Sequence, residues 1–417
     1  MPPRILPLLP SAGRPVVANG PPGPARAARP AQGIAPGPHR ERQSRRRIGV
    51  MLRDLGNQTD APGIIALNLL DHMLAADRTN EYVLFHGGDA FSGRYARLPN
   101  VESLVLRAAG KLVWDQVMVP WAARRERVDV LFHPKHSLPL VGRWKSLMHL
   151  RGSEYWVYPE YYERLDLVYQ RLMLPLYCRK ATHLIVESDY VKRDFEKFLG
   201  LRPETMTRIH LAPAPRFRPI GDAAALEAAR RTYHLPGAFC LTVTRLRQGR
   251  KYYPGKNLVE AIEAFRRSKA RARLKFVVVG AHTRDFVATS PLIADDVRRE
   301  LVVLDRVPQE DLPAIYSQAA FFVFPSSYES FGLPLTEAMA CGCPVIASQD
   351  GACPEIVGDA AVLIDPRNVW QLADAMDTLA GDAGLREHLR RRGLEVAAGF
   401  SWRRAADETL RVIDGLA

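Results

Sequence analysis

At 417 residues the chain is long enough for two or three domains, and its 47% apolar and 25% charged residues are typical of an ordinary globular protein. The formal net charge of +13 is concentrated near the start, because residues 1–47 contain nine arginines and one acid, a net +8 that leaves +5 for the remaining residues. This distribution gives little support to a nucleic-acid partner, and no run of about 18 apolar residues predicts a membrane span.

Residues 1–47 also contain 11 of the 32 prolines and no periodic apolar pattern, so we expect a disordered Pro/Arg-rich extension. Its segment "ILPLLP" is too short and too rich in proline to be the core of a signal peptide. A basic arm for an anionic membrane surface or for nucleic acid is the alternative to an extension without function.

From residue 48 the pattern alternates between strands and helices. Short apolar strands are expected at 47–52, 81–87, 101–106, 128–134, 144–150 and 181–189, with helices over "IIALNLLDHMLAA" and about 159–180. The proline-rich passage at 203–220 then predicts a linker between domains.

The second half repeats the alternation. Strands are expected at 238–245 and 274–280, and over "LVVLDRV", "FFVFPS" and "PVIAS", with helices between them. Apolar strands alternating with helices predict parallel sheets covered on both faces. We therefore expect an α/β fold of two Rossmann-like domains facing a central cleft, with limits at 48–220 and 221–395. A final helix over 396–417 is expected to pack back on the first domain.

The five cysteines (Cys178, Cys240, Cys341, Cys343 and Cys353) form neither a disulfide framework nor a zinc-binding spacing. Reduced thiols in a cytoplasmic protein are therefore expected, and no metal or other cofactor.

The stretch "YESFGLPLTEAMACG" places Glu329 before a predicted helix and Glu337 inside it. Pro334 suits the first turn of that helix, so the amides of Gly332 and Leu333 are expected at its N-terminus, where an anion can bind. Carboxylates accept hydrogen bonds from hydroxyl groups and are poor partners for phosphate. Two acids on either side of an anion site therefore fit a sugar and a ribose joined by a diphosphate. The alternative is ordinary complementation of the helix dipole by glutamate.

"YESFGLPLTEAMACGCPVIAS" resembles the E-x7-E signature of the family-4 retaining glycosyltransferases, which have the GT-B fold. The resemblance continues through "GACPEIVGDAAVLIDP" and "FSW", and is strong from about residue 300 and weak in the first half. It implies that Glu329 contacts the donor sugar and Glu337 the ribose. It also implies that the amides of Phe331, Gly332 and Leu333 meet the sugar and phosphate.

The family usually supplies an arginine and a lysine after the first strand of the second domain. In "TVTRLRQGRKYYPGKN" these positions are assigned to Arg245 and Lys256, with Arg247, Arg250 and Lys251 as rivals and a solvated basic loop as the alternative. Their expected role is to stabilise the charge of the leaving nucleoside diphosphate.

Three further positions are implied by the resemblance, with weaker support. Gly63 opens a helix after the first strand, His149 ends a strand and resembles the sugar-contacting histidine of the family, and Val307 is expected near the base. His133 and His136 are less convincing, and one of them is a candidate for the acceptor side.

The expected function is metal-independent retaining transfer of a hexose from a GDP- or UDP-sugar to a glycan, lipid-linked or small-molecule acceptor, with polysaccharide assembly as its setting. A nucleotide-sugar epimerase of the same architecture and a non-catalytic nucleotide-sugar-binding protein remain alternatives. A peripheral contact at the inner membrane face is left open, through the aromatic segment "EYWVYPEYY" at 154–162.

Overall fold

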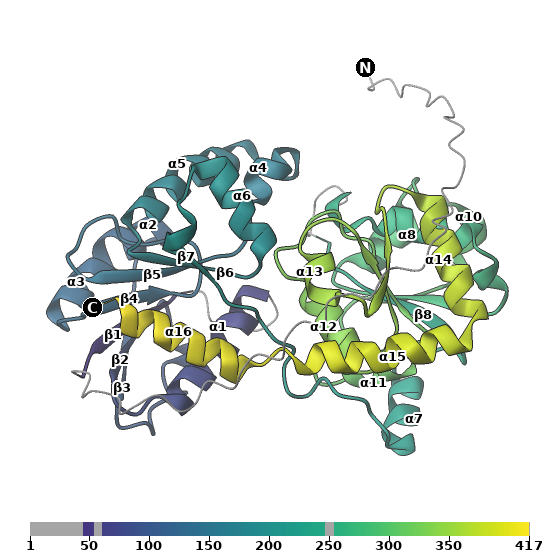
Figure 1. Cartoon of the computed structure of the whole chain (residues 1–417), viewed down its shortest axis with the longest axis horizontal. Coiled ribbons are helices and arrows are strands. Elements are labelled where there is room, and N and C mark those ends of the chain that lie inside the picture. The colour runs from purple at the N-terminus through teal and green to yellow at the C-terminus, as the bar shows by residue number, and fades with distance from the viewer. Residues whose placement is uncertain (1–44, 54–60, 247–253, 417) are drawn as a thin grey trace, which may run out of the picture. The chain divides into compact units, whose positions relative to one another are not determined.

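The structure, a computed structural model, describes residues 45–53, 61–246 and 254–416 (Figure 1). Most of the extension expected over residues 1–47 lies outside these ranges, as do the rival cations Arg247, Arg250 and Lys251. The described residues belong to one compact unit that begins at Arg45.

The first domain is built on seven parallel strands in the order β3-β2-β1-β4-β5-β6-β7. The order reverses between β1 and β4, and crevices at such reversals are where open parallel sheets bind ligands. The strands are β1 (Arg47–Leu52), β2 (Glu81–His86), β3 (Val101–Val105), β4 (Val130–His133), β5 (Lys145–Leu150), β6 (His183–Val186) and β7 (Met206–Arg208).

The second domain is built on six parallel strands in the order β10-β9-β8-β11-β12-β13. They are β8 (Phe239–Val243), β9 (Lys275–Val279), β10 (Leu301–Leu304), β11 (Phe322–Phe324), β12 (Val345–Ser348) and β13 (Ala361–Ile364). The sequence-based prediction of two parallel-sheet α/β domains is confirmed.

Alternation along the strands explains why both faces of each sheet carry helices (Figure 1). In β1, Ile48 and Val50 join one apolar cluster and Met51 joins another. In β8, Leu241 and Cys240 divide in the same way. Both faces of each sheet are therefore shielded from water, which is why the strands are continuous apolar runs in the sequence.

Helices connect the strands and cover the sheets. In the first domain they are α1 (Ala61–Ala76), α2 (Lys111–Val113), the π-helix η2 (Trp114–Met118), α3 (Val119–Arg125), α4 (Glu154–Val157), α5 (Arg164–Lys180) and α6 (Asp189–Leu199), with short 3₁₀ turns η1 (Asp89–Phe91), η3 (Pro159–Tyr161) and η4 (Pro203–Thr205). The remainder are α7 (Ala223–Thr232), η5 (Pro254–Lys256), α8 (Leu258–Arg267), η6 (Lys269–Ala272), α9 (Thr283–Thr289), α10 (Asp295–Arg298), α11 (Leu312–Gln318), α12 (Leu333–Ala340), α13 (Cys353–Val357), α14 (Val369–Gly381), α15 (Ala383–Ala398) and α16 (Trp402–Gly415). Among the described residues, no helix combines the length and the apolarity needed to cross a membrane.

One element lies where the sequence predicted only a linker. Met206–Arg208 forms β7 at the edge of the first sheet, pairing with Leu184–Val186 of β6. The prolines that suggested a linker over the whole of 203–220 lie on either side of this strand and not within it. A three-residue strand at the sheet edge therefore fits between them.

The last helix lies against the first domain. α16 packs on α1, and the Arg46 guanidinium donates to the carbonyls of Ile413, at 2.6 Å, and Asp414, at 2.9 Å. Arg46 thereby pairs two of the final carbonyls of α16, which have no partner inside the helix.

Gly280 follows β9 beside the end of β8, and a side chain at this position is expected to destabilise the fold. Its φ is +156°, and a Cβ there would lie 2.0 Å from the Thr244 carbonyl oxygen. We expect Gly280→Ala to lower the free energy of unfolding by about 2–4 kcal/mol, because backbone must move on both strands. Urea denaturation measures this change. Gly237→Ala, where a Cβ meets nothing within 4 Å, is the control, and an equal effect of the two substitutions would contradict the expectation.

Candidate functional site

A loop between β11 and α12, residues 325–332, is held in place by the segment that precedes α8. The Asn257 side-chain amide donates to the Pro325 carbonyl and to Ser327 Oγ, both at 2.7 Å. The Ser326 hydroxyl donates to the Gly255 carbonyl at 3.0 Å. These bonds fix Lys256, which lies between Gly255 and Asn257, against the loop.

Lys256 and Glu329 form an ion pair, so the structure brings two predicted site residues into direct contact. The Lys256 ammonium also lies 6.0 Å from the centre of the Phe324 ring. Both side chains are partly covered, with exposed fractions of 27% for Lys256 and 13% for Glu329. Partial burial strengthens the pair relative to one in water and leaves its edge open to a ligand.

The backbone of Glu329 is fixed from the other side. Its carbonyl accepts a hydrogen bond from the Ala352 amide at 3.0 Å. Gly351 has φ +67°, and a Cβ there would lie 2.8 Å from the Glu329 nitrogen. The segment "GA" at 351–352 therefore supports the position of Glu329, and only glycine fits the close approach.

Glu337 faces a different neighbour. It lies inside α12, is 9% exposed, and the Tyr316 hydroxyl is 3.5 Å from its carboxylate. Burial raises the pKa of Glu337 to about 7, although the Tyr316 hydrogen bond and the charge of Arg216 act in the opposite direction. The two acids of the motif thus occupy separate environments.

The start of α12 presents free amides. Gly332 is the N-cap residue with φ +91°, and Leu333 is the first helical residue. Within the described ranges, no acceptor pairs with the N–H groups of Phe331, Gly332 or Leu333. The Phe331 ring is buried against His210 and Phe400, so only its backbone is available to a ligand.

Among the described residues, Arg245 and Val307 make no contact with Lys256 or Glu329. Arg245 follows β8, is exposed, and has no side-chain partner in the described part of the chain. Val307 is half-buried and packs against the apolar core. The structure therefore places both near the ends of strands without assigning them a contact.

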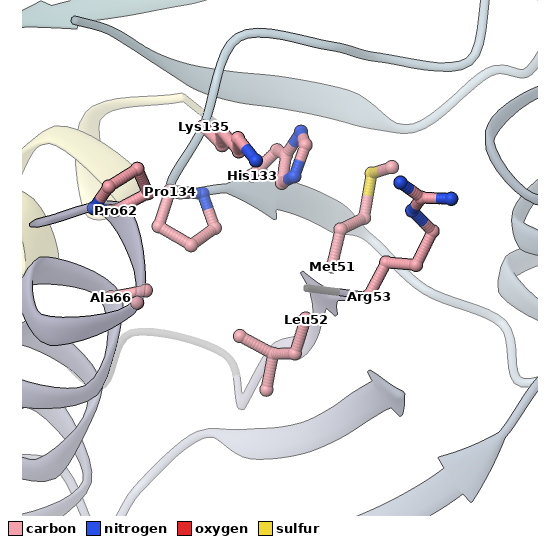
Figure 2. A pocket seen from close by; sticks show the side chains of 9 residues that line it. Met51, Leu52, Arg53, Pro62, Ala66, His133, Pro134 and Lys135 are labelled. Carbon is pink, nitrogen blue, oxygen red and sulfur yellow. The ribbon is translucent and has the colours of Figure 1, made fainter. Parts of the chain in front are cut away.

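Gly63 lines a small cavity at the reversal between β1 and β4 (Figure 2). The cavity has a volume of about 30 Å³, and its lining residues are Met51, Leu52, Arg53, Pro62, Gly63, Ala66, His133, Pro134 and Lys135. His133 and Lys135 face Pro62 and Ala66 across it (Figure 2). Gly63 itself lies in the first turn of α1.

His149 ends β5 inside a buried polar cluster that the sequence did not reveal. Its Nε2 is 3.4 Å from Glu187 Oε1, and Arg151 Nε is 3.6 Å from the same oxygen. Glu187 and His149 are each 1% exposed. The other carboxylate oxygen of Glu187 accepts a hydrogen bond from the hydroxyl of Ser330, the residue after Glu329 in the loop between β11 and α12, at 2.6 Å.

Several polar atoms of this cluster are buried and have no hydrogen-bond partner among the described residues. They are His136 Nδ1, His149 Nδ1, His149 Nε2, Arg151 Nη1 and Glu187 Oε1. Buried polar atoms are almost always paired, so a group of unpaired ones is expected to bind a ligand or ordered water.

Burial sets the protonation of the cluster. It lowers the pKa of His149 well below the ordinary value, with Arg151, His136 and His133 acting in the same direction. It lowers the pKa of His133 to about 4 and that of His136 to about 3. It raises the pKa of Glu187, against the charge of Arg151. The histidines are therefore neutral near pH 7 and can exchange hydrogen bonds with hydroxyl groups.

A second, half-buried contact joins the two domains. The Glu355 carboxylate, at the start of α13, accepts hydrogen bonds from the Asp189 amide at 2.9 Å and the Tyr190 amide at 3.2 Å, and it is 2.9 Å from His210 Nε2. Burial alone would raise the pKa of Glu355, but these hydrogen bonds outweigh it and hold the pKa below its usual value. Glu355 thus satisfies the free amides at the start of α6.

Comparison with known proteins adds the enzyme class. Residues 249–396 match the family model described as Glycosyl transferases group 1. Over 375 residues the chain is 26% identical to the O-antigen chain mannosyltransferase B of Escherichia coli, an alignment that covers 84% of this chain and 94% of that protein. The chain has the GT-B fold, and these matches support a glycosyltransferase.

Other relatives overlap less or share only the fold. The serotype-specific mannosyltransferase WbdA of Escherichia coli is 28% identical over 190 residues, which are 44% of this chain and 23% of that longer protein. The crystal structure of Anabaena HepE in complex with UDP and glucose has a TM-score of 0.68 at 18% identity and covers 89% of this chain and 100% of that chain. The glycosyltransferase WaaG has a TM-score of 0.64 at 14% identity, over 88% of this chain and 99% of that chain.

Three residues of the site were missed or left aside by sequence reasoning: Glu187, Tyr328 and Glu355. Glu187 had one usable signal, because it is a carboxylate at the end of the apolar strand "HLIV". The Tyr328 hydroxyl accepts from the Ser153 amide at 2.6 Å, and a tyrosine gives no such signal in sequence. Glu355 gives no distinctive signal in sequence, because glutamate is common in the first turn of a helix.

The raised pKa of Glu337 predicts a pH-dependent stability. Because the folded value of about 7 exceeds the ordinary 4.5, the native state binds the proton more tightly, and stability from this group is present below pH 4.5 and lost as pH rises through 7. In the parent protein this group should make the free energy of unfolding fall by up to about 3 kcal/mol as pH rises, and we expect Glu337→Gln to remove that fall. Urea unfolding at pH 5 and pH 8 measures it, and the same pH difference in both proteins would contradict the assignment.

Proposed function

We propose that this chain is a retaining glycosyltransferase of family 4, acting without a metal on a nucleotide-diphosphate sugar. The observation that carries the proposal is the Lys256–Glu329 ion pair beside the free amides at the start of α12. A cation and helix amides stabilise the charge of a leaving diphosphate, and a neighbouring carboxylate accepts hydrogen bonds from sugar hydroxyls.

We propose the following order of contacts along the donor. Glu337 receives the ribose hydroxyls, Lys256 and the amides of Gly332 and Leu333 receive the diphosphate, and Glu329 receives the sugar. Separate surroundings for Glu329 and Glu337 support this order. Arg245 is proposed as a second cation, reaching the diphosphate from the exposed end of β8, with Phe331 contributing its amide and Val307 lying toward the base.

Metal independence is part of the proposal. Lys256 supplies positive charge where a metal would otherwise be needed. Among the described residues, no group of three or more His, Cys, Asp or Glu side chains gathers to hold a metal ion.

Mannose is the first sugar to test, since the relatives above are named as mannosyltransferases. The acceptor is proposed to be a growing glycan or a lipid-linked sugar, as in O-antigen assembly. The mechanism proposed is same-face displacement, in which the departing phosphate oxygen takes the proton of the acceptor hydroxyl. The protein then contributes positioning and charge stabilisation.

The proposed domain limits are 48–220 and 221–395, with residues 396–417 returning to the first domain. The end of the first sheet at β7 and the start of the second at β8 support the boundary, and the packing of α16 on α1 supports the return.

Lys256→Ala is expected to lower turnover about 10²–10³-fold, the usual effect of losing one group that stabilises leaving-group charge. Release of nucleoside diphosphate from the donor measures it. Lys269→Ala, an exposed lysine in η6, is the matched control. A Lys256→Ala protein within threefold of the parent would remove Lys256 from the site.

The donor for that assay is identified by titration. The protein is titrated with GDP, UDP, GDP-mannose, UDP-glucose and UDP-N-acetylglucosamine, and the midpoint of thermal unfolding is followed. One nucleotide class should raise it, and Glu337→Ala should lose the shift. If none of the five raises the midpoint, the transferase proposal fails and an epimerase or another binding role replaces it.

We propose that Glu187 accepts a hydrogen bond from a sugar hydroxyl through Oε1, which lies 3.6 Å from Arg151 Nε and makes no hydrogen bond within the described part of the chain. Glu187→Gln should lower kcat/KM about 10–100-fold while leaving the affinity for free nucleoside diphosphate unchanged. Monodeoxy analogues of the donor and acceptor sugars identify the hydroxyl, because the right analogue is discriminated by the parent and much less by the variant. If every analogue is discriminated equally by both proteins, Glu187 is structural.

A further inference from the structure

Large apolar side chains are exposed mainly in one part of the first domain. Among the described residues twelve are exposed, and ten of them lie between residues 112 and 176. The ten are Leu112, Val113, Val117, Trp121, Leu140, Val141, Leu165, Val168, Leu172 and Leu176, here called the apolar patch. Exposed apolar residues scattered singly are ordinary, but a contiguous group marks a surface that contacts something.

The clearest part of the patch is α5. Leu165, Val168, Leu172 and Leu176 are spaced to fall on one face of the helix and are 87%, 55%, 65% and 41% exposed. Three other α5 residues, Leu174, Tyr177 and Cys178, are buried against the sheet. The helix is therefore apolar on its inner and its outer face, and the outer face is uncovered.

Side-chain hydrogen bonds show that the three segments carrying the patch are neighbours. Lys111 Nζ lies 3.4 Å from the Tyr169 hydroxyl, joining α2 to α5. The Gln116 side chain donates to the Leu138 carbonyl at 3.0 Å, joining η2 to the segment that carries Leu140. Lys180 Nζ donates to the Gly142 carbonyl at 2.9 Å, joining that segment to the end of α5. The segments that carry the patch therefore lie side by side in the first domain.

The charges around the patch are mostly positive. In the three stretches 111–125, 138–145 and 163–180, all of them described, the acids are Asp115, which is buried, Asp166, which is half-buried, and Glu163, which is exposed. The exposed basic residues there are Arg124, Arg125, Arg143, Lys145, Arg164, Arg171 and Arg179. The Arg125 guanidinium lies 5.4 Å from the Trp121 ring, beside the patch.

We propose that the apolar patch docks the protein on an anionic lipid surface. Leucine and tryptophan side chains enter the boundary between headgroups and acyl chains, while the surrounding arginines bind lipid phosphates. A second copy of the chain is a poor occupant, because a self-complementary interface would bring seven exposed cations against seven, with Glu163 as the single exposed carboxylate that each copy offers in these stretches. The tyrosines of the aromatic segment 154–162 are half-buried, with Tyr155 packed on Tyr162 and Tyr158 on Tyr161, so the more exposed apolar patch is proposed as the main contact.

This proposal does not depend on the sugar-transfer chemistry. The patch shares no residue with the donor loop, and vesicle binding is measured without substrate. Failure of one proposal therefore leaves the other standing.

Vesicle flotation with the full chain tests the proposal. The vesicles are phosphatidylcholine alone and a roughly three-to-one mixture of phosphatidylcholine and phosphatidylglycerol. The parent protein should float with the mixed vesicles, and Leu165→Ser/Leu172→Ser should reduce the bound fraction at least about tenfold. Leu292→Ser, an equally exposed leucine outside the patch, should behave as the parent. Arg164→Glu/Arg179→Glu should lose the preference for the anionic lipid.

Three results would overturn it. The first is a parent protein that does not float with either vesicle. The second is unchanged flotation of Leu165→Ser/Leu172→Ser, which would assign binding to the basic residues before Arg45. The third is a parent dimer in sedimentation that this double substitution converts to a monomer, which would assign the patch to self-association. Matching near-ultraviolet dichroism of parent and variants shows that folding is retained.

Discussion

The ion pair between Lys256 and Glu329 is the contact around which the second domain's site is arranged. It joins two loops that are 73 residues apart in sequence, and each loop is fixed by its own supports. Asn257 and Ser326 bind the backbone of the other loop, and the Gly351–Ala352 segment holds Glu329 from behind. Without these supports two long side chains would not keep one geometry, because an ion pair near the surface is worth little by itself. The pair balances its own charges, and a diphosphate with a sugar offers Lys256 an anion and Glu329 a hydroxyl in exchange.

The first domain contributes a different kind of surface. Its side of the site is buried, its histidines are neutral, and several polar atoms have no partner within the described chain. Leaving such atoms unpaired costs about 1–3 kcal/mol each, so an arrangement of this kind is retained where a ligand completes it. Ser330 connects the two surfaces, because it lies beside Glu329 and donates to Glu187. A hydrogen bond from a sugar hydroxyl to Glu187 would therefore act directly on the loop that carries Glu329.

The parts that could be read from sequence are those with local signals. Buried parallel strands appear as apolar runs, so the fold was predicted. The "FGLP" turn indicates the start of a helix, and the structure has α12 begin there with free amides. Lys256 was assigned because of its place before a helix. Glu187 could not be paired with His149 from sequence, since 38 residues separate them and only the adjacency of β5 and β6 brings them together. The apolar patch was equally hidden, because "RLDLVYQRLMLPLYCRK" is apolar on two faces and sequence does not say which face the sheet covers. β7 was missed because prolines surround a strand of three residues.

A crystal structure of the protein with an intact nucleotide sugar, GDP-mannose first, tests the central claim most directly. The account predicts that Lys256 Nζ leaves Glu329 and contacts a diphosphate oxygen, that Glu329 accepts a hydrogen bond from the sugar, and that Glu337 accepts one from the ribose. A donor bound elsewhere, with the Lys256–Glu329 pair unbroken, would contradict it.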